Sequence, residues 1–411
     1  MTTGLRVAHV LRKFDAAALG GTETHVAEVT RRLEQRGVHC EVHAPLGPTS
    51  HGGLDVPLLR YRAFCPFVGP AEKRRALWAN AGNLASIDEP IRLLRDRGLS
   101  LAHLHTTGRI GGAVRTAMRL TGRPYLLSVH GPLLSGGTFL AQDTERRLSG
   151  VVDLGRPLGL IFGARRVLDD AARVICFNDE EHAALSARIG DRAVRMDHGV
   201  DVPRLRSGDA ARARSRWPRL GAAQIVLHLG RLCGQKDQLL SVRAFAAGAP
   251  DDAQLVLAGP ETDRGYLANL EREARLLGVW DRVLVLGNVG SADVADLFAA
   301  ATVCLLPSQH EAFGLVALES WAAGRATLFA RVGGLADLAK QLGPGAPALA
   351  DRDPRPWAVA LAALLSQPSL RQEAAERGAK LLAARFSWDV VAAGLEALYR
   401  EVLDERARRA A

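Results

Sequence analysis

The sequence has few cysteines and no long hydrophobic run. Its five cysteines are dispersed singly, and no two have the spacing of metal ligands: Cys40, Cys65, Cys176, Cys233 and Cys304. An odd, dispersed set fits buried thiols in a reducing compartment. No apolar run reaches the roughly 20 residues that span a bilayer, and the first residues lack the cleavage region of a signal peptide. We therefore expect a cytoplasmic protein without a membrane-spanning helix.

Charge of one sign does not dominate the chain strongly. The net charge of +9 comes from 53 Lys and Arg against 44 Asp and Glu, and residues 1–200 hold 27 of these basic residues and 20 of the acidic ones. This half could face an anionic partner such as a phosphorylated acceptor or the inner membrane surface, contacted peripherally. The alternative is an ordinary solvated surface. We expect no nucleic acid partner, because basic residues alternate with acidic ones and no nucleic-acid motif accompanies them.

One stretch, residues 307–335, organises the rest of the chain. An apolar run at 301–306 predicts a buried strand, and a helix carrying Glu319 follows a Phe313-Gly314 turn. Glu311 stands just before this helix, and a second apolar run at 326–330 returns to the sheet. This strand–loop–helix–strand order predicts half of a doubly wound α/β domain, whose ligands bind at the carboxyl ends of the strands.

The chemistry of this stretch favours a nucleotide sugar. The free N–H groups at a helix start beside Gly314 suit a phosphate. The carboxylates of Glu311 and Glu319 would repel a phosphate but accept hydrogen bonds from sugar hydroxyls. The alternative is that Glu311 caps the helix and Glu319 is solvated.

Three further positions follow predicted strands. Arg231 and Lys236 at a strand-to-helix turn could both reach a diphosphate, with a salt bridge to Asp237 as the alternative. His130 follows the predicted strand 125–129, and the alternative there is a loop histidine satisfied by backbone. Before the first helix, Gly20 and Gly21 precede Thr22, the expected N-cap, and would let a phosphate or sugar approach.

Five segments, in this order, resemble those of the family 4 retaining glycosyltransferases: Gly20-Gly21, His130-Gly131, Gly230 to Lys236, Gly259-Pro260-Glu261 and Glu311 to Glu319. The resemblance implies the GT-B fold, an α/β architecture of two Rossmann-like doubly wound domains facing a cleft. It also implies an acceptor-binding domain at 1–201, a donor-binding domain at 202–385, and a terminal helix at about 386–411 that crosses back to the N-terminal domain.

The same resemblance assigns roles residue by residue. Glu311 would contact the hydroxyls of the donor sugar, and Glu319 the ribose. Arg231 and Lys236 would clamp the diphosphate, and His130, rather than His103 or His105, would lie near the anomeric carbon. The remaining donor contacts would be largely backbone, at Gly20, Gly21, Gly230, Gly259, Asn288, Val289, Phe313, Gly314 and Leu315. The segment Leu134 to Ser149 would shape the acceptor site.

These assignments predict hexosyl transfer from a UDP-, GDP- or ADP-sugar to a hydroxyl acceptor, without a cofactor or metal. We expect Asp351-Arg352-Asp353, although it fits a metal motif, to be structural. Two departures stand out: Gly333-Gly334-Leu335-Ala336-Asp337 lacks the family's Pro and Glu, and His198 replaces an Asn. The alternatives are a GT-B epimerase and a non-catalytic nucleotide-sugar-binding protein. A phosphorylase would need a pyridoxal lysine, and lysines are few.

Overall fold

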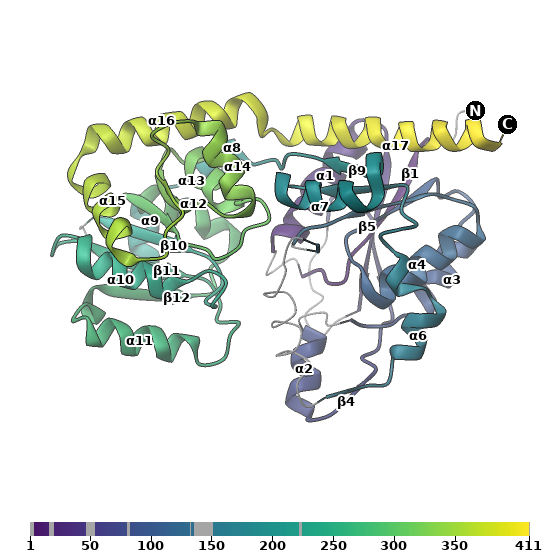
Figure 1. Ribbon diagram of the computed structural model, residues 1–411, viewed down its shortest axis with the longest axis horizontal. Coiled ribbons are helices and arrows are strands. Elements are labelled where there is room, and N and C mark those ends of the chain that lie inside the picture. The colour runs from purple at the N-terminus through teal and green to yellow at the C-terminus, as the bar shows by residue number, and fades with distance from the viewer. Residues whose placement is uncertain are drawn as a thin grey trace. The chain divides into compact units, whose positions relative to one another are not determined.

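The computed structural model describes residues 4–15, 20–46, 54–79, 83–131, 133–134, 151–221 and 224–410 (Figure 1). Internal contacts divide the chain into two units, each with its own sheet. Unit 1 comprises Met1–Asp197 and Trp388–Ala411, and unit 2 comprises His198–Ser387.

Unit 1 is built on a parallel sheet of seven strands in the order β3-β2-β1-β5-β6-β8-β9. The strands are β1 (Arg6–Val10), β2 (His39–Pro45), β3 (Leu58–Tyr61), β5 (Leu101–Leu104), β6 (Tyr125–Ser128), β8 (Arg173–Cys176) and β9 (Ala193–Arg195). β4 (Phe67–Val68) and β7 (Val152–Asp153) form a separate antiparallel pair. Every residue of β5 and β6 is buried, as expected for strands covered on both faces.

Helices connect these strands. They are α1 (Gly21–Gln35), α2 (Ala71–Ala79), α3 (Asp88–Arg95), α4 (Gly108–Leu120), α6 (Arg156–Ile161), α7 (Asp179–Ile189) and the C-terminal α17 (Trp388–Ala410). α17 packs on α1, so the end of the chain belongs to the same unit as its beginning. The expected return of the terminal helix to the N-terminal domain is therefore observed.

Unit 2 has a parallel sheet of six strands in the order β12-β11-β10-β13-β14-β15. The strands are β10 (Ile225–Leu229), β11 (Gln254–Ala258), β12 (Val283–Gly287), β13 (Val303–Leu306), β14 (Ala326–Ala330) and β15 (Ala348–Leu349). The strand order reverses direction next to β10, where the chain passes from β12 to β13. Ligands bind at such a switch point in doubly wound sheets.

The helices of unit 2 are α8 (Val202–Arg206), α9 (Ala210–Arg216), α10 (Gln238–Gly248), α11 (Tyr266–Leu276), α12 (Ser291–Ala300), α13 (Leu315–Ala322), α14 (Gly333–Leu342), α15 (Pro354–Ser366) and α16 (Pro368–Arg385). The core between sheet and helices holds large side chains, and Trp321 and Trp357 are 1% and 0% exposed. Asp353 caps α15 by accepting a hydrogen bond from the backbone N–H of Arg355. Together with Asp351, whose carboxylate accepts from the N–H of Asp353, it shapes the helix entry.

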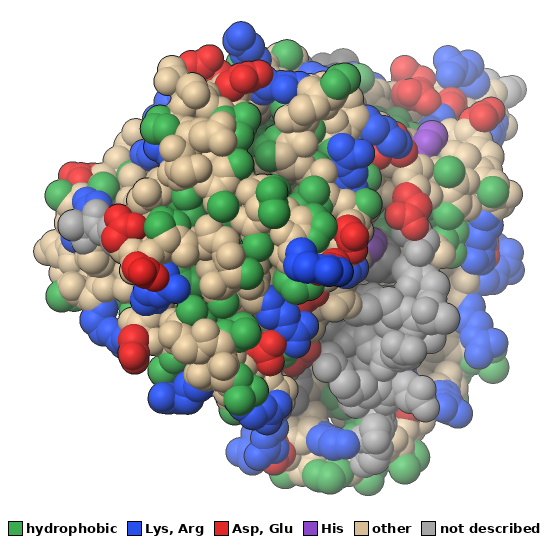
Figure 2. Space-filling view, turned by 60° about the vertical axis from the view of Figure 1, so that its left-hand side comes forward, with side chains coloured by type: hydrophobic (Ala, Val, Ile, Leu, Met, Phe, Trp, Pro, Cys, Tyr) green, Lys and Arg blue, Asp and Glu red, His purple; other side chains and the backbone are tan. Residues whose placement is uncertain are grey.

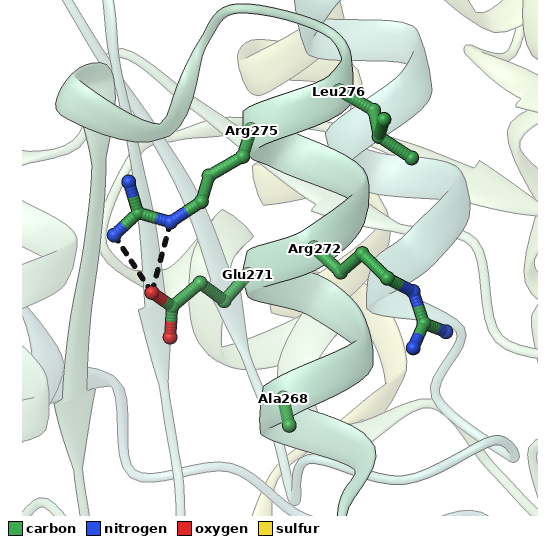
Figure 3. A pocket seen from close by; sticks show the side chains of 5 residues that line it. All are labelled: Ala268, Glu271, Arg272, Arg275 and Leu276. Carbon is green, nitrogen blue, oxygen red and sulfur yellow. Dashed lines mark hydrogen bonds and ion pairs between the residues drawn. The ribbon is translucent and has the colours of Figure 1, made fainter.

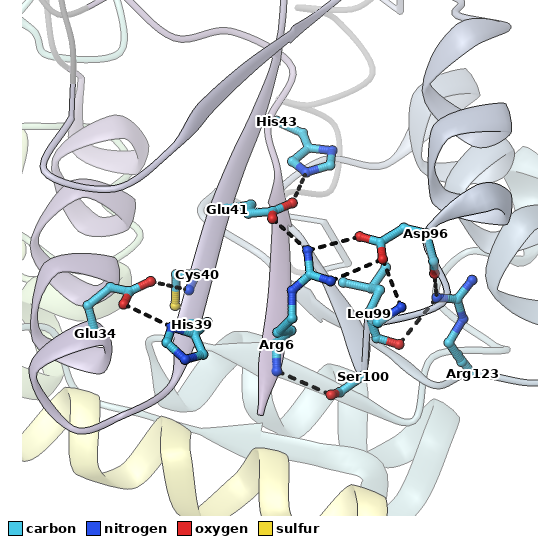
Figure 4. Close-up of polar contacts among 11 residues, drawn as sticks. Arg6, Glu34, His39, Cys40, Glu41, His43, Asp96, Leu99, Ser100 and Arg123 are labelled. Atoms are coloured by element: carbon cyan, nitrogen blue, oxygen red, sulfur yellow. Dashed lines mark hydrogen bonds and ion pairs between the residues drawn. The ribbon is translucent and has the colours of Figure 1, made fainter. Parts of the chain in front are cut away.

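A polar network ties β1, β2 and α3 of unit 1 together (Figure 4). Arg6, at the amino end of β1, reaches Glu41 at 2.7 Å and Asp96 at 3.1 Å. On β2, Nε2 of His43 lies 3.4 Å from the carboxylate of Glu41, and Nδ1 donates a hydrogen bond of 2.6 Å to the buried Glu89. Burial alone lowers the pKa of His43, but the bonds to the two carboxylates outweigh it and raise the pKa to about 9. Partly buried carboxylates are thus paired rather than left alone.

The structure corrects one local expectation. α1 begins at Gly21 with Gly20 as its N-cap, so Thr22 lies inside the helix rather than at its cap. Among the described residues, no helix is long and apolar enough to cross a membrane.

Candidate functional site

The predicted donor residues of unit 2 follow three adjacent strands. Gly230 and Arg231 follow β10, Gly259 follows β11, and Glu311 lies shortly after β13. These strands are neighbours in the sheet and run parallel, so their carboxyl ends open on the same edge. The topology therefore brings together residues that are up to 81 positions apart in the chain.

The two glycines at this edge allow the backbone turns to touch. Gly259 has a φ of +148°, and a Cβ placed on it would lie 2.1 Å from the carbonyl oxygen of Gly230. The turns are further linked by a hydrogen bond of 2.9 Å from the N–H of Leu232 to the carbonyl of Pro260. Any side chain at residue 259 would force these turns apart, and the glycines also leave backbone open for a ligand to approach.

Lys236 and Glu311 form an ion pair between the turn after β10 and the turn after β13. Their side chains are only 15% and 13% exposed, and the hydroxyl of Ser308 donates a second hydrogen bond to Glu311 at 2.9 Å. The expected alternative, a pair between Lys236 and Asp237, is wrong, because Asp237 caps α10 and pairs with Arg352. The alternative that Glu311 caps α13 is also wrong.

Arg231 is directed differently from Lys236. Its side chain is exposed, and its guanidinium donates to the side-chain oxygen of Gln235 at 3.1 Å. Gln235 in turn donates to the carbonyl of His310 at 3.1 Å, which joins the same two turns a second time. The exposed guanidinium of Arg231 and the paired ammonium of Lys236 are therefore cations of two kinds at one sheet edge.

The N-terminus of α13 is shaped by glycines. Gly314, with a φ of +93°, is its N-cap, and no side chain caps this end in the described structure. A Cβ on Gly314 would lie 2.4 Å from the Leu335 side chain, and one on Gly333 would lie 2.1 Å from the carbonyl oxygen of Glu311. The Gly333-Gly334 pair thus supports the loop of Glu311 directly, even without the Pro and Glu usual in the family. Helix N–H groups left without a cap are suited to an anion.

Glu319 lies in the second turn of α13, one turn nearer the start than expected, because the helix begins at Leu315. Its side chain is 23% exposed and lies 3.6 Å from Arg204 of α8. Burial raises the pKa of Glu319 to about 7, and Arg204 lowers it by a smaller amount. A half-buried acid with a pKa near neutrality is typical of a ligand-binding position.

The other predicted donor residues of unit 2 lie at or next to this edge. Asn288 is exposed and Val289 half-buried directly after β12. Phe313 is 5% exposed, and its ring lies 5.4 Å from that of His198, to which the sequence assigned no role. Leu315 is half-buried at the first position of α13. On the face drawn in Figure 2, Lys and Arg side chains lie among Asp and Glu side chains rather than in one patch.

In unit 1, His130 lies within a cluster of aromatic rings. Its Nε2 is 2.9 Å from Nδ1 of His105, and its ring stacks on Phe177 at 5.1 Å. The ring of His25, from α1, lies 5.1 Å away. His105 and His103 belong to the same cluster.

Gly20 and Gly21 stand at the N-terminus of α1, the helix that carries His25 into this cluster. A Cβ on Gly20 would lie 2.7 Å from the carboxylate of Glu23. The segment Leu134 to Ser149 lies outside the described residues except for Leu134.

A shallow hollow beside α11 contains none of the predicted residues (Figure 3). It is lined by Ala268, Glu271, Arg272, Arg275 and Leu276. The carboxylate of Glu271 accepts two hydrogen bonds from Arg275, at 3.0 and 2.8 Å. Glu271 and Arg275 neutralise one another, and all five lining residues belong to α11. We therefore favour the sheet edge over this hollow as the candidate donor site.

Two family profiles match the chain. The profile described as glycosyl transferase 4-like domain matches residues 20–198, and the one described as glycosyl transferases group 1 matches residues 211–381. A D-inositol 3-phosphate glycosyltransferase of Acidothermus cellulolyticus is 30% identical over 94% of this chain and 87% of its own length. The chain belongs to the family 4 (group 1) glycosyltransferases. D-inositol 3-phosphate glycosyltransferase 2 of Catenulispora acidiphila is 29% identical over 95% of this chain and 92% of its own length.

Solved structures agree on the architecture of this glycosyltransferase. Sucrose-phosphate synthase from Thermosynechococcus elongatus superposes with a TM-score of 0.74 at 22% identity, over 98% of this chain and all of that one. HepE from Anabaena, in complex with UDP and glucose, superposes with a TM-score of 0.71 at 16% identity, over 97% and 100%. At these identities the likeness shows the fold, and it confirms the predicted GT-B class.

Sequence reasoning missed several residues that the structure places beside the predicted ones. Arg204 stands 115 residues before its partner Glu319, within a segment that the sequence shows only as a basic linker. His198 lies against Phe313. The sequence signal that could have found it is that His198 stands where the family has an Asn. His9 and His25 carry no motif of their own and reach the His130 cluster through strand pairing and helix packing.

The raised pKa of Glu319 gives a test of its environment. A folded-state pKa raised from 4.5 to about 7 means that stability is fully present below about pH 4.5 and is lost as the pH rises through 7. Glu319→Gln has no titrating carboxyl at this position. Between pH 5 and pH 8 the free energy of unfolding of the variant should therefore rise relative to that of the wild type, by about 1 kcal/mol or more. Denaturant unfolding at both pH values measures this. Parallel curves for the two proteins would show that Glu319 is not desolvated.

Proposed function

We propose that this glycosyltransferase is a retaining enzyme that moves a hexosyl group from a nucleoside diphosphate sugar to a hydroxyl acceptor. The observation that carries the proposal is the Lys236–Glu311 pair beside the uncapped N-terminus of α13. A cation and a helix terminus suit a diphosphate, while a carboxylate suits sugar hydroxyls. All three lie in one unit at the strand ends after β10 and β13.

The leaving group gives the cations their role. As the bond to the sugar breaks, negative charge accumulates on the nucleoside diphosphate, and groups positioned in advance around it lower the barrier. Lys236 is held in place by Glu311, and Arg231 can swing in as a planar fork. In the free protein Glu311 neutralises Lys236; with donor bound, the diphosphate would take the ammonium and release Glu311 for the sugar. We propose that these cations act in place of a metal ion.

Several features support retention and the remaining roles. Glu319, as the ribose-binding residue, would present its half-buried carboxyl to the two hydroxyls. Following what the family resemblance implies, we propose front-face attack, with the donor phosphate accepting the proton of the incoming hydroxyl. His130 would contact the transferred sugar. The configuration of the product, read from its anomeric proton coupling, tests retention.

The relatives suggest the kind of acceptor. Those compared are named D-inositol 3-phosphate glycosyltransferases. We propose a polyhydroxylated acceptor, with a phosphorylated cyclitol as the first compound to assay, in agreement with the basic balance of residues 1–200. An epimerase would instead turn over a nucleotide sugar without any acceptor, and a binding protein would be stabilised by the donor without turnover. Thermal stabilisation by UDP-, GDP- and ADP-sugars identifies the base, because a bound donor raises Tm by mass action.

Lys236→Ala should lower the transfer rate by about 100-fold or more, because the developing charge on the diphosphate loses its fixed cation. Steady-state transfer assays with the donor identified by thermal shift measure the effect, and an EDTA control tests independence from metal ions. Lys340→Ala is the matched control, since Lys340 is a 70% exposed lysine of unit 2 in an ion pair with Asp337. Turnover near that of the wild type in Lys236→Ala would remove Lys236 from the site.

Glu311→Gln keeps the shape of the side chain but removes its charge and one strong acceptor. We expect donor hydrolysis and transfer to fall by about 10-fold or more, because the sugar hydroxyls lose a charged partner worth about 1.5–3 kcal/mol. The free nucleoside diphosphate should bind at least as tightly as to the wild type, because it no longer competes with Glu311 for the Lys236 ammonium, and calorimetry measures this. Loss of nucleotide binding together with sugar transfer would point to a collapsed loop instead of lost sugar contacts.

We further propose that unit 1 contacts an anionic membrane surface through α6 and the strand pair before it. Leu160 and Ile161 are 77% and 72% exposed, and Leu154 is 62% exposed. Arg156 and Arg165 stand exposed beside them in the chain. Apolar side chains rimmed by arginines match the chemistry of an interface with acidic lipids.

Sedimentation with vesicles tests this contact. The wild type should bind vesicles containing acidic lipid more than neutral ones, and the double variant Leu160→Ser/Ile161→Ser should lose most of that binding. The control is Leu276→Ser, which removes an equally exposed leucine, 77%, from unit 2. Equal sedimentation of all three proteins, or none of the wild type, would contradict the contact.

A further inference from the structure

Unit 1 places histidines at the ends of three adjacent parallel strands. His9 of β1 is directly paired with His103 of β5, while His105 and His130 follow β5 and β6. Because residues 103 and 105 lie on the same face of their strand, these rings converge on one side of the sheet. Centroid separations are 5.3 Å between His9 and His105, and 5.2 Å between His105 and His130.

Two ring-to-ring hydrogen bonds join three of these histidines into a chain. Nδ1 of His9 lies 3.0 Å from Nε2 of His105, and Nδ1 of His105 lies 2.9 Å from Nε2 of His130. His9 is 0% exposed and His105 is 6% exposed, whereas His130 is half-buried. The chain therefore runs from the interior of unit 1 towards its surface.

The rings in the interior are neutral. Burial lowers the pKa of His9 to about 3 and, helped by the neighbouring histidines, lowers the pKa of His105 well below its usual range. A neutral imidazole carries a single N–H, so it donates through one nitrogen and accepts through the other. The two hydrogen bonds must then point the same way along the chain.

The inner end of the chain determines its direction. Nε2 of His9 is buried and has no hydrogen-bond partner among the described residues. If His130 donated inward, the last hydrogen would sit on this nitrogen as a buried N–H without an acceptor, which is rare in proteins. If His9 donates outward, only a bare lone pair is left there. The outward direction leaves the hydrogen of His130 on its Nδ1.

We propose that His9 and His105 are positioning residues that hold His130 in one ring orientation and as its Nδ1–H tautomer. His130 then presents a hydrogen-bond donor, not an acceptor, to whatever it binds. This rests on the proposed function only in assigning the transferred sugar as that partner. A neutral donor suits sugar hydroxyl oxygens.

The same histidines could be considered as metal ligands, since ligand atoms of His9, His103 and His105 lie within 4.8 Å of one another. Both nitrogens of His103 are already engaged, one with the Tyr399 hydroxyl at 2.6 Å and the other with the Ser128 hydroxyl at 2.8 Å. A metal ion would have to break these bonds and the bond between His9 and His105. The observed contacts favour the hydrogen-bonded chain.

The tautomer can be read directly in the wild-type protein. With ¹⁵N-labelled histidine, protonated and bare ring nitrogens resonate far apart, and the signals of residue 130 are assigned by their loss in His130→Asn. We expect His130 at neutral pH to be protonated at Nδ1 and bare at Nε2. An Nε2–H tautomer, an even mixture, or a zinc ion that co-purifies at one per chain and is lost on replacing His9 would each overturn the proposal.

Variants of His9 separate positioning from packing. His9→Leu removes the donor, so His130 should become a mixture of tautomers, and kcat for transfer should fall about 10-fold with little change in KM, as when an orienting partner is lost. His9→Asn places an amide N–H near the position of Nδ1, so it should restore both the single tautomer of His130 and the wild-type kcat. If neither variant changes the His130 signals, the chain does not orient that ring.

The control is His228→Leu in unit 2. His228 is also 0% exposed, has one hydrogen bond, of 2.7 Å to Ser241, and has a buried Nε2 without a partner in the described chain. His228→Leu should lower the free energy of unfolding about as much as His9→Leu does, and it should leave the NMR signals of His130 unchanged. Because the NMR result does not depend on transfer, it distinguishes failure of this inference from failure of the proposed function.

Discussion

The Lys236–Glu311 ion pair is the interaction on which the donor site depends. It joins the turns that follow β10 and β13, at the point where the sheet order reverses. Removing one partner from such a half-buried pair leaves the other charge unpaired, which costs far more than the pair itself contributes. The pair therefore links both turns, and under the proposed function a diphosphate would replace Glu311 beside Lys236 and a sugar would replace Lys236 beside Glu311.

The glycines around this pair serve the same arrangement. A side chain at residue 259 would meet the carbonyl of Gly230, and one at residue 333 would meet the carbonyl of Glu311, so neither position has room for one. Close backbone packing presents N–H groups rather than side chains to a ligand. The site is thus formed by two held charges and an otherwise bare backbone edge.

The two units handle polar groups differently. Unit 2 concentrates charge at its strand ends, whereas the corresponding edge of unit 1 carries neutral imidazoles whose pKa values are lowered by burial. Burying a charge requires a partner, while burying a neutral ring requires only that its nitrogens be hydrogen-bonded.

Local sequence patterns predicted some features of this protein and not others. The apolar runs at 125–129, 301–306 and 326–330 predicted β6, β13 and β14 to within two residues. The start of α1 was misplaced, because Thr22 and Gly20 are both acceptable caps and packing decides between them. The alternative partner that the sequence offered for Lys236 was the adjacent Asp237, but the carboxylate of Asp237 is used by its own helix and by Arg352.

The sequence by itself determined the fold class, the family and the set of candidate residues, because apolar periodicity and ordered motifs are local properties of the chain. Only the tertiary structure decided which side chains meet: Lys236 with Glu311, Glu319 with Arg204, and His9 with His105 and through it His130. These pairs are separated by 75 to 115 residues, or by 96 and 25 along the histidine chain. Whether these side chains meet depends on the order and register of the strands that carry them. Parallel strand pairing sets both, and the local sequence of one strand does not indicate which strand it will pair with.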